Sequence, residues 1–343
     1  MKEDDRPEDA IEVPDAPPVP GLTFRGYRDE GDLPRLLEVY NECQLADGWS
    51  FAKDLETFQN IFRNLKNTEP EKDVVLVKVD GRVVGFSTQL WEKEDDRTLV
   101  FPITIKVVPG WRGHGIRRAM LRRCEARARE VARGSPETQE HLTSIWVSED
   151  ETSMIAILEK AGWRPARHFY EMLRSLDRPI QETPMPEGTT LRVPRGEDEY
   201  RKVFDALFEA LEDNWGIAQP QEEDYQRFLG RPTFQPENWM VAWHGDQVAG
   251  TVLSWINEKE NEALGRSWGY TEDITVRRPF RRQGLATALI SRSLAMLRDR
   301  GMTHANLGVD TENQDMDLDL YIDLDYQVYK NWMVYRKPLV AGP

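Results

Sequence analysis

The chain has few cysteines and no long apolar segment. Among its 343 residues, only Cys43 and Cys124 are cysteines, and their separation matches no metal-ligand spacing. A disulfide framework or a zinc site is therefore not expected, and so few thiols suit the reducing cytoplasm, where we place the protein. No apolar run approaches the roughly 18 residues that a membrane-spanning helix needs. We therefore predict no membrane partner and no metal.

Basic residues are also in short supply. The chain has 45 Lys and Arg against 60 Asp and Glu, which gives a net charge of −15. Affinity for nucleic acid comes largely from Lys and Arg that neutralise phosphates, so we expect no nucleic-acid partner. A local basic loop can still bind one small anion.

The first 20 residues are acidic and rich in proline. They hold seven acidic residues, two basic residues and five prolines. A segment of this composition buries too little apolar surface to fold by itself. We predict a flexible acidic tail over residues 1–20.

The most informative segment spans residues 275–290, where a strand ends in an Arg- and Gly-rich loop that leads into a helix. Such a loop binds phosphate groups, because the amides at a helix N-terminus point at an anion. Gly284 allows the backbone to approach a ligand closely. A weaker copy contains Arg112 and Gly115. The two copies lie 281 − 112 = 169 residues apart, so the chain consists of two related halves.

Each half shows the same order of elements: a strand, two helices, a hairpin, a strand, the loop, a helix, a strand, a helix and a strand. AspGly at 80–81 and GlyAsp at 245–246 mark the hairpins. This order predicts a mixed sheet with helices on both faces. We expect an N-terminal domain over 21–176, a Pro-containing linker over 177–188 and a C-terminal domain over 189–340.

Both halves resemble the GNAT superfamily of acyl-CoA-dependent N-acyltransferases, and the tandem layout is similar to that of mycothiol synthase and related two-domain acetyltransferases. The resemblance covers about residues 21–338. In this family the loop has Arg or Gln, two residues, Gly, one residue, and then Gly or Ala. Arg281, Gly284 and Ala286 satisfy the pattern, whereas the first half has Arg117 in place of the last small residue. The resemblance implies an α/β fold with two GNAT domains in tandem, each a largely antiparallel twisted sheet with helices on both faces.

The resemblance also implies acetyl-CoA as co-substrate. Backbone groups of the strand before the loop would pair with the pantetheine arm, and the amides of the loop and helix would hold the pyrophosphate. The expected cofactor-binding residues are Ile274, Thr275, Val276, Arg281, Arg282, Gln283, Gly284, Leu285, Ala286, Thr287 and Asn313.

Two residues are candidates for proton transfer. In the family an Asn is followed eight residues later by a Tyr near the CoA sulfur, and Asn313 and Tyr321 match this signature. A Tyr hydroxyl there can protonate the leaving thiolate. An amine acceptor must itself lose a proton before it attacks a thioester. Glu272, which alternates with the apolar residues of its strand, is the candidate base, and Asp273 on the opposite face is the reserve.

The first half lacks both groups. Leu158 aligns with Tyr321, and the strand before the first loop presents only apolar residues on the equivalent face. We therefore expect the N-terminal domain to be degenerate: it is structural, or it binds CoA without turnover, and catalysis belongs to the C-terminal domain. The apolar residues of that strand are Phe101, Ile103, Ile105 and Val107.

The expected acceptor is a primary amine of a small molecule. Asp213 and Trp215 lie between the first two helices of the second half, where GNAT enzymes commonly shape the acceptor site. Over 311–325, apolar residues alternate with acidic ones, which by itself favours a strand. The resemblance favours a helix there, and we follow the resemblance.

Two alternatives remain open. The protein could bind or sense CoA without catalysis, or it could bind a phosphate or an RNA end through the Arg-rich segment from Arg112 to Arg133. The overall acidity weighs against the second alternative. The sequence leaves the choice between monomer and homodimer open.

Overall fold

The computed structural model describes residues 10–48, 53–65, 67–94, 97–134, 140–212, 220–312 and 318–339. Two compact units are present. The first unit comprises residues 1–167 and 332–343, and the second unit comprises residues 168–331. In the described part of the chain, no helix has the length and apolar character needed to cross a membrane.

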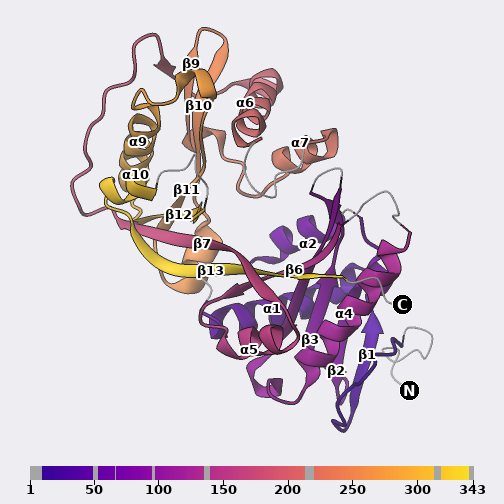
Figure 1. The fold of residues 1–343 in the computed structure, drawn as a ribbon. Coiled ribbons are helices and arrows are strands. Elements are labelled where there is room, and N and C mark those ends of the chain that lie inside the picture. The colour runs from indigo at the N-terminus through magenta and orange to yellow at the C-terminus, as the bar shows by residue number, and fades with distance from the viewer. Residues whose placement is uncertain are drawn as a thin grey trace. The chain divides into compact units, whose positions relative to one another are not determined.

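The first unit is built around a sheet with the order β1-β2-β3-β5-β6 (Figure 1). Its neighbouring strands are antiparallel except for the parallel pair β5 and β6. Asp80 and Gly81 both have positive φ, as the predicted hairpin turn requires. The elements are β1 (Leu22–Gly26), α1 (Leu33–Ala46), α2 (Leu55–Arg63), α3 (Pro70–Asp73), β2 (Val74–Val79), β3 (Arg82–Gln89), β4 (Glu92–Lys93), β5 (Thr98–Val107), α4 (Ile116–Ala132), β6 (Glu140–Ser148) and α5 (Thr152–Lys160).

The second unit repeats this plan with the order β12-β11-β10-β9-β8. Helices α9 and α6 cover opposite faces of its sheet (Figure 1). Strands β11 and β12 are parallel, and the other neighbours are antiparallel. The elements are β8 (Thr190–Leu191), α6 (Gly196–Leu211), α7 (Glu222–Leu229), β9 (Trp239–His244), β10 (Gln247–Trp255), α8 (Glu258–Leu264), β11 (Trp268–Val276), α9 (Leu285–Asp299), β12 (His304–Asp310) and α10 (Leu318–Asp323).

The last strand of each half completes the sheet of the other unit. Strand β7 (Arg164–Ser175) begins in the first unit and pairs antiparallel with β12 from residue 169 onward. Strand β13 (Gln327–Pro338) belongs to the second half by sequence, but its residues 332–338 pair with β6. The compact units therefore differ from the continuous ranges 21–176 and 189–340 that the sequence predicts. The segment 177–188 contains no helix or strand.

Part of the predicted flexible tail has defined contacts. The Ile11 amide donates to the Phe24 carbonyl at 3.0 Å. Val13 is buried in the core of the first unit. Asp15 forms an ion pair with Arg122 of α4 at 2.5 Å. Residues 10–20 thus pack on the first unit. Val13 provides the apolar contact, which the acidic, proline-rich composition of the whole segment does not indicate.

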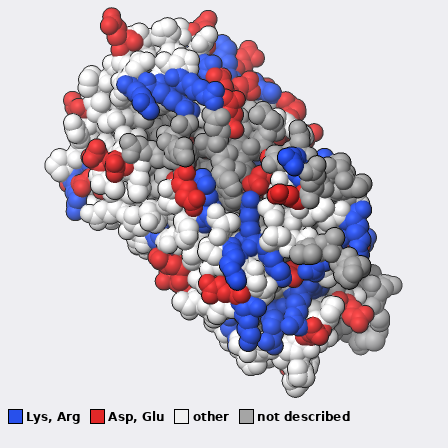
Figure 2. All heavy atoms as spheres, viewed as in Figure 1, with Lys and Arg blue, Asp and Glu red and all other residues white. Residues whose placement is uncertain are grey.

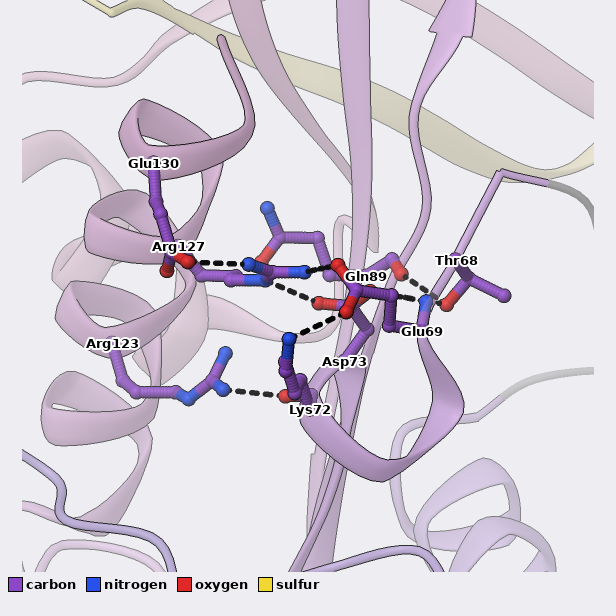
Figure 3. Close-up of polar contacts among 8 residues, drawn as sticks. All are labelled: Thr68, Glu69, Lys72, Asp73, Gln89, Arg123, Arg127 and Glu130. Atoms are coloured by element: carbon purple, nitrogen blue, oxygen red, sulfur yellow. Dashed lines mark hydrogen bonds and ion pairs between the residues drawn. The ribbon is translucent and has the colours of Figure 1, made fainter. Parts of the chain in front are cut away.

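A buried cluster of charges joins α3 to α4 (Figure 3). Arg127 donates to Asp73 at 2.7 Å and to Glu69 at 2.6 Å, and it pairs with Glu130 at 2.9 Å. The Asp73 side chain is fully buried. Since a buried charge is tolerated only with partners, these ion pairs stabilise the packing of α4 on α3.

The same contacts bear on the Arg-rich helix. Lys and Arg gather over α4 with Asp and Glu beside them (Figure 2). Within the protein, Arg122, Arg127 and Arg129 pair with carboxylates, and Arg123 donates to the Lys72 carbonyl. These arginines stabilise the folded protein through internal contacts, which weakens the alternative that this helix binds a phosphate or an RNA end.

Candidate active site

The loop between β11 and α9 has the geometry of an anion cradle. It passes through a short 3-10 turn, Arg278–Phe280, and reaches Gly284, the N-cap of α9, at φ 79°. A methyl group added at Gly284 would meet nothing within 4 Å. The space before the first turn of α9 is therefore open, and the amides there can face an anion.

Arg281 shapes this loop. Its Nε donates to the Val276 carbonyl at 3.0 Å, and its Nη2 donates to the Ala210 carbonyl at 3.2 Å. In the first half, the Nε of Arg112 makes the equivalent bond to the Val107 carbonyl at 2.9 Å. These contacts position the turn after the strand, and the expected cofactor contact of Arg281 remains a prediction.

Strands β11 and β12 separate before the loop. Their parallel ladder joins residues 268–270 to residues 304–306 and ends there. Ile274, Thr275 and Val276 lie beyond the end of the ladder, as the predicted pairing with a pantetheine arm requires. An extended ligand can add to such an edge as a strand would. These residues and the open cradle at Gly284 fit acetyl-CoA.

A β-bulge places two carboxylates together. Thr251 pairs with Thr275, but Leu253 pairs with Glu272, so β11 has one extra residue between them. Asp273 takes up this extra residue with φ 48°, and its carbonyl accepts a 2.9 Å bond from the Thr251 hydroxyl. The prediction that Asp273 lies on the opposite face from Glu272 is wrong, because the bulge interrupts the alternation of the strand.

Glu272 and Asp273 line the same cavity, which has a volume of about 310 Å³. At one side Arg231 lies 3.6 Å from the Asp273 carboxylate. The wall combines these charges with aromatic rings from α7, the following loop and two strands. The remaining lining residues are Phe228, Thr233, Phe234, Trp239, Leu253 and Trp255.

The protein around Glu272 favours its neutral form. Burial, followed by the charges of Asp273 and Glu171, raises the pKa of Glu272 to about 8. Arg231 and a backbone hydrogen bond from Gly308 act in the opposite direction. Burial also raises the pKa of Asp273. A carboxyl with a pKa near neutrality suits proton transfer from an amine.

Tyr321 lies near Glu272. It projects from α10 and is 1% exposed. Burial raises the pKa of Tyr321, and the neighbouring Tyr326 and Glu272 raise it further. Its ring meets that of Tyr326 edge-on with centroids 6.1 Å apart. A phenol held neutral in this way keeps its proton at neutral pH, and the charge of Glu272 acts on it, so the two predicted proton-transfer residues lie in one region of the second unit.

Four residues around this pair were not predicted: Tyr326, Thr271, Glu171 and Asn306. Tyr326 shares a 2.8 Å hydrogen bond with the Thr271 hydroxyl. Glu171, on β7, accepts from the Asn306 amide at 2.7 Å and contributes to the raised pKa of Glu272. Glu171 reaches the second unit only because β7 pairs with β12, and no local sequence signal indicates this.

The helix implied by the resemblance is confirmed over Leu318–Asp323. The alternation of apolar residues that favoured a strand is overridden there. Asp325 follows the helix at φ 72°, a conformation that Asp tolerates better than most residues. Asn313, Asp213 and Trp215 lie outside the described residues. Over the described ranges, no group of three or more His, Cys, Asp or Glu is arranged to hold a metal ion.

Comparison with known proteins identifies the fold and the chemistry. The acetyltransferase (GNAT) family matches residues 33–163 and 203–321, one segment in each half. The chain belongs to the GNAT family. Members of this family use acetyl-CoA as co-substrate, and the chain is an N-acetyltransferase.

Its curated relatives include mycothiol acetyltransferases. That of Streptomyces bingchenggensis is 28% identical over 75% of this chain and 78% of its own length. That of Salinispora arenicola is 28% identical over 83% of this chain and 88% of its own length. The similarity therefore extends through both halves of this GNAT protein.

Solved structures share the tandem fold. A GCN5-related N-acetyltransferase from Sphaerobacter thermophilus has a TM-score of 0.69 and 23% identity, covering 97% of this chain and 98% of that one. A tandem GNAT protein from the clavulanic acid biosynthesis pathway has the same TM-score and 17% identity, covering 94% and 99%. At these identities the likeness supports the fold alone.

Proposed function

We propose that the second half transfers an acetyl group from acetyl-CoA directly to a primary amine of a small molecule. The observation that carries the proposal is that Glu272 lines a cavity next to the place where β11 and β12 separate, with the buried Tyr321 close enough for the charge of Glu272 to act on it. The expected cofactor contacts of the loop and strand, including Asn313, belong to this proposal.

Acetyl-CoA supplies the activated acyl group as a thioester. Glu272, in its ionised form, accepts a proton from the amine, directly or through one water. The neutral amine nitrogen then bonds to the thioester carbonyl carbon, the carbon–sulfur bond breaks, and the nitrogen releases its second proton to solvent. Tyr321 donates its hydroxyl proton to the leaving thiolate and regains one from solvent, while Glu272 releases its proton to solvent.

The cavity at Glu272 is the proposed acceptor site. In their ionised forms the Glu272 and Asp273 carboxylates attract an ammonium group, and the rings of Phe234 and Trp255 offer apolar surface for the rest of the molecule. We place Asp213 and Trp215 in the same acceptor site on the strength of the family resemblance.

Thiol release from acetyl-CoA, measured against a panel of primary amines, tests this proposal. The panel includes the acceptor of mycothiol acetyltransferases, because such enzymes are relatives. We expect amine-dependent release that Glu272→Gln and Tyr321→Phe each reduce strongly. Tight CoA binding with no release on any amine would instead support the non-catalytic alternative.

A further inference from the structure

The first unit has the same loop as the active site, but the N-terminal segment lies on it. A methyl group added at Gly115 would lie 3.3 Å from the Cβ of Pro17, whereas one added at Gly284 would meet nothing within 4 Å. The buried side chain of Val13 and the 2.5 Å pair between Asp15 and Arg122 fix the segment just before this contact. The N-terminal segment therefore lies directly over Gly115, the N-cap residue of α4.

A second contact closes the loop from inside. Arg117 stands at the first turn of α4, where the second half has Ala286. Its side chain is buried, and its Nη2 donates to the Ser153 hydroxyl at 3.0 Å. Ser153 lies at the start of α5, so the bond links the helix after β5 to the helix after β6. In the second half, the proposed pantetheine arm would pass between the two corresponding helices to reach the separating strands.

The space between β5 and β6 is also small and charged. The cavity there has a volume of about 150 Å³, and its lining includes Lys106 and Glu151. These two side chains form a buried pair with 4.0 Å between Nζ and Oε1. An apolar acyl-pantetheine arm would have to separate this pair, which costs the attraction between two buried charges.

We propose that the cofactor site of the first unit is closed, because residues 10–20 and Arg117 occupy the place of acetyl-CoA. Each chain then binds one molecule of CoA, in the second unit. The N-terminal segment is then an internal cover rather than a free tail. Arg117 and the N-terminal segment together close the first loop, whereas the small side chain of Ala286 leaves the second loop free to admit the cofactor.

Calorimetric titration of the full-length chain with CoA tests the proposal directly. We expect a stoichiometry of one. Ala286→Arg, which copies the first half into the second, is expected to abolish this binding. A stoichiometry of two, or a single site that survives Ala286→Arg, would overturn the proposal. Absence of thiol release with one CoA bound would count against the proposed catalysis and leave the closure standing.

Opening the first unit provides the reverse test. Removal of residues 1–18 together with Arg117→Ala is expected to raise the stoichiometry from one to two in a protein whose melting curve remains cooperative. Arg129→Ala, which changes an arginine of the same helix that pairs with Glu125, is the matched control and should leave the stoichiometry at one. A stoichiometry of one in the folded, opened variant would contradict the assigned role of these residues. If removal of Val13 prevents folding, the titration of the unaltered chain remains decisive.

Discussion

The two halves share the backbone arrangement around the loop, but they differ in the side chains and the strand geometry beside it. Both hairpins carry a bulge at the same place, after Val83 in the first half and after Val248 in the second. Both loops enter a helix through a left-handed Gly. The comparison teaches that the loop motif marks the fold, while other features decide whether a half can carry chemistry.

The decisive difference lies in one strand. β11 has the bulge at Asp273, whereas β5 pairs with β3 without a register shift. Counted along these ladders, Thr104 stands opposite Thr88 where Glu272 stands opposite Leu253. The parallel ladder also extends further in the first half, through residue 103, so its strands separate later. The first half therefore has neither the carboxylate pair nor the early opening.

Removal of the proposed base is expected to have the largest effect. Glu272→Gln keeps the shape of the side chain but cannot accept the proton, so kcat should fall by about 100- to 10,000-fold. Steady-state thiol release measures this. Thr104→Val, at the corresponding register position of the first half, is the control and should leave kcat unchanged. An unaffected Glu272→Gln enzyme would remove Glu272 from the mechanism.

Loss of Arg127 should destabilise the first unit most strongly. Arg127→Ala leaves the buried Asp73 carboxylate without its main partner, which typically costs about 3–5 kcal/mol in the free energy of unfolding. Chemical denaturation followed by circular dichroism measures the change. Arg63→Ala, which breaks an exposed pair with Glu30, is the control and should change little. Equal effects of the two substitutions would refute a special role for the cluster.

Tyr321→Phe should lower kcat by about 100-fold, because it removes only the proton donor. The matched variant is Tyr326→Phe, which removes the other buried hydroxyl and its bond to Thr271. We expect this variant to lose stability but to retain more activity than Tyr321→Phe. The reverse ranking in thiol-release assays would assign the donor to Tyr326.

The pH dependence of catalysis should follow Glu272. Its pKa of about 8 means that the ionised form, which accepts the proton, is scarce at pH 7 and predominates at pH 9. Activity per enzyme should therefore rise about tenfold between these values and level off above them. Glu272→Gln should remove this rise in activity. Any pH dependence that remains should then come from the titration of the amine. A wild-type profile that falls with pH over this range would contradict the assignment.

Substitutions of Asp273, the bulge residue, should have the smallest effect on the protein. Asp273→Ala and Asp273→Gly both remove the carboxylate, but only Gly adopts a φ of 48° without strain. The Gly variant should therefore be more stable than the Ala variant by about 1 kcal/mol. Thermal unfolding measures the difference, and equal stabilities would mean that the positive φ is not maintained.

The sequence by itself determined the local elements. Apolar periodicity, the hairpin turns and the loop motif depend on residues close together in the chain, so the repeat and the α/β plan could be predicted. The helix over Leu318–Asp323 needed the family resemblance, because alternation alone favoured a strand. Glu272 and Tyr321 could be proposed by the same reasoning.

Only the tertiary structure decided which distant segments meet. The exchange of β7 and β13, the position of Glu171, the bulge at Asp273 and the contact of Pro17 with Gly115 all depend on pairing between remote parts of the chain. A strand pattern predicts that a segment pairs, but not with which edge or in which register. For that physical reason the motif located the site, while the fold decided which half is open.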